Sequence, residues 1–203
     1  MPLITAINIQ KRAAARFSVY IDESYSFSLS DLELSASSLR VGQALSPAEV
    51  TQWQEQAHED KAYNLVLRYL SYRERSRYEV LEYLRRKDYA PEIAAGIVDR
   101  LQAAGLQDDA RFAAAWVADR RALRPRSRRQ LEQELLKKGV DRPMIAEAVA
   151  VLGGDEQAAV LDELVSRKRR QSQYQDNAKL MAYLGRQGFG YAEIKRALER
   201  PSD

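Results

Sequence analysis

An internal repeat of about fifty residues constrains the fold more than any other feature of this sequence. A shift of 51 residues matches a helix-start serine and three apolar positions: Ser127 on Ser76, Leu131 on Val80, Leu135 on Leu84 and Leu152 on Leu101. A shift of 49 residues matches a third copy: Leu180 on Leu131, Leu184 on Leu135, Gly188 on Gly139, Ile194 on Ile145 and Leu198 on Val149. Repeats of this length are typical of arrays in which each copy is one small helical unit.

Helix-start signals divide the middle copy, residues 108–152, into three helices. Asp108 or Asp109 is expected to cap the first helix, because a carboxylate there accepts hydrogen bonds from unpaired backbone N–H groups. Ser127 and Gln130 have the spacing of a capping box at the start of the second helix. Asp141 is expected to cap the third. The positions expected to be buried are Phe112, Ala115, Trp116, Leu123, Leu131, Leu135, Ile145, Ala148, Val149 and Leu152.

Helix-end signals occur at corresponding positions of the copies. Gly139 can take the left-handed conformation that ends a helix, so that Val140 folds back onto Leu135. Asp88 stands at this position in the first copy and tolerates the same conformation. Gly105 is a further helix end, between the first two copies. The predicted nine helices of the array span residues 58–73, 77–87, 91–104, 109–123, 128–138, 142–152, 156–170, 177–187 and 191–199.

The N-terminal region has a different pattern. Apolar residues alternate on either side of residues 22–24, as Phe17, Val19 and Ile21 and then Tyr25, Phe27 and Leu29, which predicts a β-hairpin. Residues 3–10 alternate weakly and are expected to add a third strand. A short helix and a loop should follow over residues 31–45, and Ser46, Pro47 and Glu49 begin another helix. The predicted fold is mainly α, an array of three three-helix units with a small N-terminal hairpin or three-stranded extension, divided into regions 1–45, 46–107, 108–153 and 154–203.

Composition argues for a cytoplasmic, non-enzymatic protein. The chain has 203 residues, 45% apolar and 30% charged, with no apolar run long enough to span a membrane and no secretory h-region at its N-terminus. It has no cysteine and a single histidine, His58, expected to be a solvated helix residue, so catalytic triads and metal sites built on these residues lack their parts. Phosphate-binding glycine motifs are absent, and Asp108 and Asp109 are expected to be caps. We therefore expect no enzymatic activity and no cofactor.

Basic residues gather near the end of the first helix of each copy, or in the turn that follows. The clusters are Arg73, Arg75 and Arg77; Arg120, Arg121, Arg124, Arg126, Arg128 and Arg129; and Arg167, Lys168, Arg169 and Arg170, with Lys137 and Lys138 at the end of the next helix of the middle copy. They could simply form a solvated surface, partly neutralised by Glu74, Asp119 and Glu132. The middle cluster, however, places six arginines within ten residues without an acidic residue among them. Arginine suits bidentate contact with phosphate, so this cluster predicts an anionic partner.

The middle copy resembles a known family. The run DDARFAAAWVADRR, followed by LEQELLKKGV, resembles the central signature of the RecX family of regulatory proteins, and so does the preceding SRYEVLEYLRRKDYAPEIAAGIVDRLQAAGLQDD. The resemblance covers residues 58–199, and the N-terminal hairpin resembles extensions that some members carry. One departure is that Arg124, Pro125 and Arg126 stand where the family usually has a glycine.

The resemblance implies a regulator of RecA that acts in recombination, DNA repair and the SOS response. Such a protein binds the RecA filament on single-stranded DNA, within its helical groove, and inhibits its recombinase, ATPase and coprotease activities. Two alternatives stay open from the residues alone: a direct DNA-binding helical protein without a RecA partner, and a helical-repeat scaffold for acidic peptides. The chain is expected to be a monomer.

Overall fold

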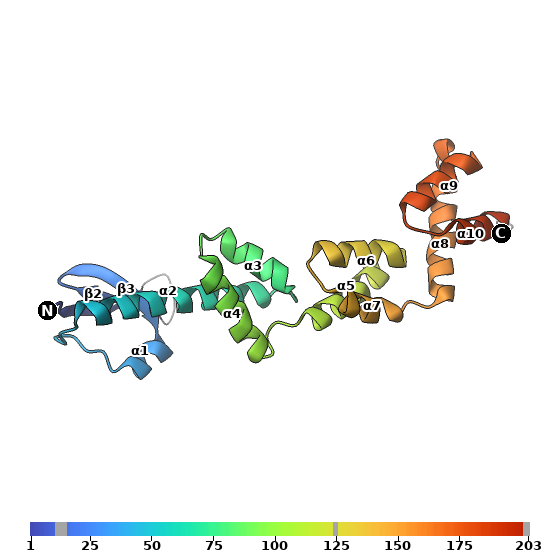
Figure 1. Ribbon diagram of the computed structural model, residues 1–203. Helices are drawn as coiled ribbons and strands as arrows, with labels where there is room; N and C mark the ends of the chain where they lie inside the picture. The colour runs from blue at the N-terminus through green and yellow to red at the C-terminus, as the bar shows by residue number, and fades with distance from the viewer. Residues whose placement is uncertain (11–15, 124–125, 201–203) are drawn as a thin grey trace. The chain divides into compact units, whose positions relative to one another are not determined.

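The computed structural model describes residues 1–10, 16–123 and 126–200. In these residues the chain is mainly helical, with a three-stranded antiparallel sheet at its N-terminus (Figure 1). This confirms the predicted fold class. The chain divides into two compact units, residues 1–72 with 84–99 and residues 73–83 with 100–203, and we describe each by itself.

The sheet consists of three strands, β1 (Ile4–Ile9), β2 (Arg16–Ile21) and β3 (Ser24–Ser30), in the order β1-β2-β3. Asp22 and Glu23 connect β2 to β3 with positive φ angles of 47° and 68°. Two successive residues with positive φ match the twist of a tight hairpin. The predicted hairpin and its third strand are therefore confirmed.

One side chain of the hairpin lies on the other face from that expected. Val19 pairs with Phe27, but Tyr20 pairs with Tyr25, because a bulge shifts the register between these pairs. An extra residue in one strand moves the following side chain to the opposite face. Tyr25 is thus 57% exposed and meets Tyr20 edge to face, whereas Phe27 and Leu29 are buried.

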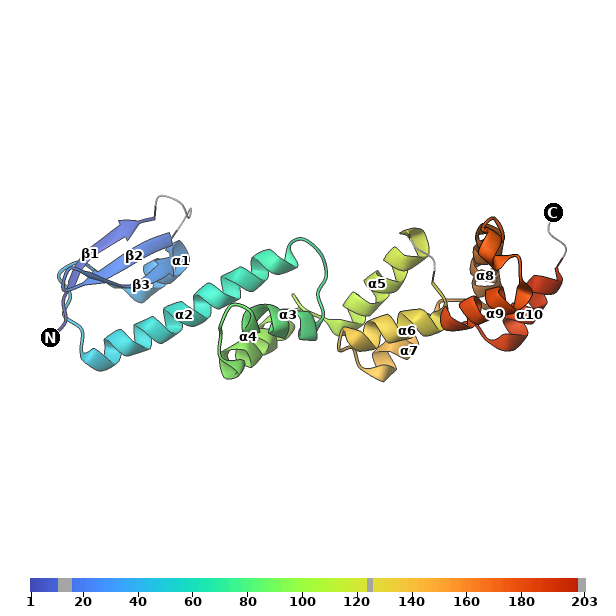
Figure 2. The ribbon, with the colours of Figure 1, turned by 90° about the horizontal axis from the view of Figure 1, so that it is seen from above.

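Two helices accompany the sheet in the first compact unit, α1 (Asp31–Ser37) and α2 (Pro47–Leu70) (Figure 2). α2 packs against β3, and its Trp53 stacks on Phe27 in a core that includes Ile4, Val19, Leu29 and Leu45. Ser46 and Glu49 form the predicted capping box of α2. α2 is one continuous helix, although the first helix of the array was expected to begin at residue 58, since no glycine or proline interrupts it after Pro47.

His58 lies on the exposed surface of α2, as predicted, with its ring centroid 4.6 Å from that of Tyr89. Helices α3 (Arg77–Arg85) and α4 (Pro91–Ala103) each contribute residues to both compact units.

The middle copy of the repeat lies within the second compact unit and forms a three-helix domain, called here the second after its place in the repeat. It consists of α5 (Asp109–Leu123), α6 (Arg128–Lys137) and α7 (Arg142–Ala150), which pack on one another. Its core contains Phe112, Ala113, Val117, Leu131, Leu135, Val140, Ile145, Ala148, Val149 and Leu152. Trp116 and Ala115 are half-buried, and Leu123 is 78% exposed, so the expectation that Leu123 is buried is wrong. α5 is longer than α6 and α7, and its last turn lies beyond the core that they form.

The third three-helix domain consists of α8 (Gly154–Arg169), α9 (Asn177–Arg186) and α10 (Tyr191–Glu199), with a short 3-10 helix, Ser172–Tyr174, before α9. Leu161, Leu180, Leu184, Phe189 and Ile194 form its core.

The predicted helix ends are confirmed in all three copies. Asp88, Gly139 and Gly188 have φ angles of 61°, 73° and 91°. After each of these residues the next backbone N–H donates to the carbonyl five residues before it, as when Val140 donates to Leu135 at 3.2 Å. This is the hydrogen bond that closes a Schellman motif.

The predicted helix starts are confirmed in part. The Ser127 side chain accepts from Gln130 N at 3.2 Å, but the Gln130 side chain donates to Gln187 instead of returning to Ser127, so the capping box is incomplete. Asp141 occupies the position before α7 without a side-chain capping bond. Asp108 caps α5, accepting from Ala110 N at 2.8 Å.

Candidate basic binding surface

A carboxylate of α6, Glu134, gathers basic side chains around Trp116. The indole Nε1 of Trp116 donates to Glu134 Oε2 at 2.8 Å, and Arg120 Nε donates to the same oxygen at 2.9 Å. Arg126 Nε lies 3.8 Å from the other carboxylate oxygen. Glu134 thus partly neutralises two arginines of the middle basic cluster.

A second carboxylate, Glu79 in the first turn of α3, is buried between two cations. Arg73 donates to its two oxygens at 2.9 and 3.0 Å, and Lys138 Nζ donates to Oε1 at 2.6 Å. Burial raises the pKa of Glu79, but the hydrogen bonds and charges of Arg73 and Lys138 lower it further, so its pKa lies below the ordinary value. Glu79 is therefore an anion that fixes the positions of Arg73 and Lys138.

The Trp116 ring connects these two carboxylate centres. The Arg120 guanidinium carbon lies 4.2 Å from the ring centroid, Lys138 Nζ lies 5.2 Å from it, and the Arg73 guanidinium carbon lies 6.0 Å from it. These distances are within the range of cation–π attraction. The structure therefore brings together residues from the first two basic clusters on one aromatic ring.

The ion pairs of Glu79 and Glu134, with the cations around Trp116, form one network of charged side chains. An open groove between α6 and α9 is lined in part by cations that lie outside this network. Its volume is about 510 Å³, and the charged residues that line it are Arg126, Arg129, Lys137, Arg186 and Glu134. Arg129, Lys137 and Arg186 are exposed and form no ion pair with any residue that the structure describes. Three unpaired cations along one groove make it a candidate site for a polyanion.

Arg186 is the groove residue that the sequence reasoning did not single out. It lies in the last turn of α9, and the 49-residue shift of the repeat places it on Lys137 in the last turn of α6. The repeat alignment could therefore have found it.

Several other predicted site residues lie away from this groove. Arg121 forms a two-point ion pair with Glu156, at 2.6 and 3.0 Å, and Arg128 donates to the Leu152 carbonyl at 2.9 Å. Arg75 is half-buried and Arg77 is exposed, near the start of α3. Arg124 lies outside the described residues.

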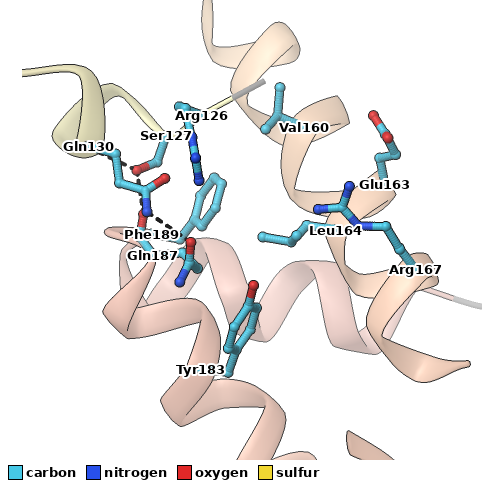
Figure 3. A pocket seen from close by; sticks show the side chains of 10 residues that line it. All are labelled: Arg126, Ser127, Gln130, Val160, Glu163, Leu164, Arg167, Tyr183, Gln187 and Phe189. Carbon is cyan, nitrogen blue, oxygen red and sulfur yellow. Dashed lines mark hydrogen bonds between the residues drawn. The ribbon is translucent and has the colours of Figure 1, made fainter. Parts of the chain in front are cut away.

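The third basic cluster is spread over separate contacts. Arg169 donates to the Tyr174 and Gln175 carbonyls, and Lys168 Nζ lies 4.7 Å from the ring centroid of Tyr183. Arg167 points from α8 into a small cavity of about 50 Å³ that Arg126 enters from the other side (Figure 3). Arg170 is exposed at the end of α8. Arg167 of this cluster thus shares a cavity with Arg126 of the middle one.

The paired aspartates at the start of α5 have different roles: Asp108 caps α5, as expected, and Asp109 accepts hydrogen bonds from another helix start. Asp108 caps α5, and Asp109 Oδ1 accepts from Arg77 N at 2.7 Å, at the start of α3, and from Gln107 Nε2 at 2.7 Å. Within residues 1–10, 16–123 and 126–200, histidine and carboxylate side chains form no group of three that could hold a metal ion. No helix among those residues has the length and apolar character needed to cross a membrane.

Fold and surface together define a protein of tandem three-helix domains with a basic groove. Models of three RecX regions match the chain: the regulatory protein RecX N-terminal domain at residues 2–46, the first three-helix domain at 62–101 and the second at 108–149. The chain therefore belongs to the RecX family of regulatory proteins.

Individual relatives agree with this assignment. The regulatory protein RecX of Bacillus subtilis is 30% identical over 98% of this chain and 77% of the relative. That of Mycobacterium marinum is 40% identical over 66% of this chain and 81% of the relative. A crystal structure of a regulatory protein RecX has the same fold, with a TM-score of 0.78 at 24% identity over 98% of this chain and all of the other. RecX from Lactobacillus salivarius matches with a TM-score of 0.61 at 25% identity, over 70% of this chain and 94% of the other.

Proposed function

We propose that this chain binds the RecA filament on single-stranded DNA and inhibits its recombinase, ATPase and coprotease activities. Family membership supports RecA as the partner. The observation that carries the proposed contact with DNA is the row of cations along the groove between α6 and α9 that form no ion pair within the described part of the chain, Arg129, Lys137 and Arg186. Basic side chains without internal partners gain most from neutralising phosphates, because they release condensed counterions from the DNA.

The network around Trp116 supports the same proposal. Glu79 and Glu134 hold Arg73, Arg120 and Lys138 in fixed positions beside the groove residue Arg126. A basic surface that is already ordered loses little conformational entropy when it binds. Tandem helical domains, in addition, offer an extended surface that suits a filament with a regular repeat.

The direct test is RecA ATP hydrolysis on single-stranded DNA with increasing amounts of this protein. We expect hydrolysis to fall as the protein is added. Unchanged hydrolysis at amounts stoichiometric with RecA would contradict the proposal.

The triple variant R129A/K137A/R186A should inhibit RecA more weakly than the wild type. Removing three phosphate-binding charges is expected to weaken filament binding at physiological salt by at least about tenfold. The matched control K61A/R142A/R196A removes the same charge at exposed positions outside the groove and should inhibit like the wild type. Equal weakening in both variants would mean that net charge acts rather than the groove.

Direct DNA binding without RecA is the second candidate, and the same groove supports it because its cations need no protein partner. The salt dependence of binding to bare single-stranded DNA separates the two. If this activity dominates, the logarithm of the affinity should fall steeply with the logarithm of salt concentration. R129A/K137A/R186A should then reduce the slope by about 2, because each phosphate that is no longer neutralised changes it by about 0.7.

Replacing Glu134 by glutamine should strengthen binding to DNA or to the filament. The change removes the carboxylate that lines the groove and releases Arg120 and Arg126 for phosphate, so we expect an affinity gain of about threefold to tenfold, or roughly 1 kcal/mol. Trp116 reports the change directly, since its Nε1 donates to Glu134 and its fluorescence can be isolated in a W53F background. Glu147→Gln, an equal charge change on an exposed part of α7, should leave both the affinity and the fluorescence unaltered.

A further inference from the structure

The second and third three-helix domains meet through a polar joint at the start of α6 and the end of α9. The Ser127 hydroxyl, before the first residue of α6, donates to the carbonyl of Gln187 at 2.5 Å. The Gln130 amide donates to the Gln187 side chain at 2.8 Å (Figure 3). Gly188 completes the joint, because a Cβ atom there would lie 2.7 Å from Ser127 Oγ and 3.0 Å from Arg129 Cβ.

The same joint occurs between the start of α3 and the end of α6. The Ser76 hydroxyl donates to the carbonyl of Lys138 at 2.7 Å, and Lys138 Nζ donates to Glu79 at 2.6 Å. A Cβ atom on Gly139 would lie 2.6 Å from Tyr78 Cβ. Each residue of this joint corresponds in the repeat to a residue of the other.

Two surfaces define the joint. The donor end is the N-cap serine with the residue three positions later, namely Ser76 with Glu79 or Ser127 with Gln130. The acceptor end is the residue that caps the C-terminus of the partner helix together with the left-handed glycine after it, namely Lys138 with Gly139 or Gln187 with Gly188. The side chains that face each other across the joint are a carboxylate with an ammonium in one case and two amides in the other.

The array has one further acceptor end and one further donor end, and neither has the residues that form the joint. The acceptor end of the first copy is Lys87 with Asp88, which is exposed and already carries a Cβ where the joint requires glycine. The donor end of the third copy is Asp176 with Lys179. Asp176 accepts hydrogen bonds from Ala178 N and Lys179 N, and a carboxylate has no proton to donate to a carbonyl.

We propose that four residues prevent the two ends of the array from binding a second copy of this chain. They are Lys87 and Asp88 at the acceptor end and Asp176 and Lys179 at the donor end. If the donor end of one molecule approached the acceptor end of another, a carboxylate would face a carbonyl oxygen, Lys179 would face Lys87, and the Asp88 side chain would occupy the space reserved for glycine. Each contact is repulsive. A donor end with serine and an acceptor end with glycine would instead be complementary. Such a head-to-tail contact would repeat from molecule to molecule and build open chains of this protein.

One test transfers the closing residues into an existing joint. S127D/Q130K/Q187K gives the second joint three of the four closing residue types, those of Asp176, Lys179 and Lys87, and keeps Gly188. Q130E/Q187K instead gives it the carboxylate and ammonium of the first joint. Because the chain has no cysteine, spin labels can be placed at A118C on α5 and A192C on α10, both at exposed positions.

We expect the distance between the labels to keep a narrow distribution in the wild type and in Q130E/Q187K and to broaden in S127D/Q130K/Q187K, with helicity unchanged in all three. A narrow distribution in S127D/Q130K/Q187K would overturn the proposal. The readout needs neither RecA nor DNA, so it is independent of the proposed function.

The other test replaces the closing residues at the two array ends by residues that can form the joint. K87E/D88G creates an acceptor end with a carboxylate and a glycine, and D176S creates a matching donor end whose Lys179 can pair with Glu at position 87. Each variant alone should sediment at the monomer mass of 23.1 kDa, and their mixture should form a complex of twice that mass. K87E/D88G mixed with wild type, which retains Asp176, should stay monomeric. If K87E/D88G and D176S stayed monomeric when mixed, or if the wild type associated through these ends, the proposal would be contradicted.

Discussion

Gly139→Ala should lower the free energy of unfolding by about 2–4 kcal/mol, the largest loss that we predict. Gly139 has a φ of +73°, a conformation that costs an L-residue about 1–2 kcal/mol. The new Cβ would also lie 2.6 Å from Tyr78 Cβ, and relieving such overlap in a packed site costs about 1–3 kcal/mol. Thermal unfolding followed by calorimetry measures the sum.

Gly105→Ala separates the two contributions. Gly105 also ends a helix with a positive φ, +66°, but a Cβ built there meets no atom within 4 Å. Gly105→Ala should therefore lower the free energy of unfolding by the conformational contribution alone, about 1–2 kcal/mol. Equal losses at the two positions would show that Tyr78 does not restrict residue 139.

Glu79→Gln should lower the free energy of unfolding by about 1.5–3 kcal/mol at neutral pH. The change removes the charge that accepts hydrogen bonds from Arg73 and Lys138 at a buried position, and bonds to charged groups contribute about this much. Urea unfolding of the wild type and the variant gives the difference. The exposed Glu147→Gln changes the same charge and should have almost no effect.

The pH dependence of this difference has a defined sign. The pKa of Glu79 is lower in the folded protein than in the unfolded chain, so the ionised carboxylate contributes stability above the unfolded value of about 4.3. That contribution disappears as pH falls through the folded pKa, where Glu79 becomes protonated. The stability difference between the wild type and Glu79→Gln should therefore shrink on acidification, and a constant difference would contradict the assigned role.

Local chemistry determined the features that the sequence could predict. Asp88, Gly139 and Gly188 were expected to take left-handed conformations because few residues tolerate them, and all three do. The hairpin followed in the same way from alternation on either side of a short turn. These features depend on neighbours within a few residues, and a single sequence contains that information.

Features that depend on distant partners could not be predicted. The Gln130 side chain had the spacing to complete a capping box, but Gln187, 57 residues away, accepts its hydrogen bond instead. Leu123 continues the apolar period of α5 beyond the reach of α6 and α7. In these two cases tertiary packing overrides a correct local pattern. The bulge that places Tyr25 on the other face has a different origin, because it lies within the hairpin itself and the alternation of apolar residues did not mark it.

The candidate site shows the same division. Its basic residues could be found from their clustering in the sequence, and Arg186 could have been found from the repeat. The sequence did not show that Glu134 would pair with Arg120 and Arg126, or that Glu79 would pair with one cation from each of the first two copies, since this depends on how α3, α5 and α6 pack. Those pairings divide the basic residues into a fixed network and a set of free cations.

The second helix of each copy also sets the register of the array. The left-handed residue lies twelve positions after the N-cap in every copy, at 88 after 76, at 139 after 127 and at 188 after 176. Inserting or deleting one residue in α6 would rotate its acceptor end by about 100° relative to its donor end and misalign both neighbours at once. Length variation among family members should therefore fall in the connections between domains, with these three helices constant in length.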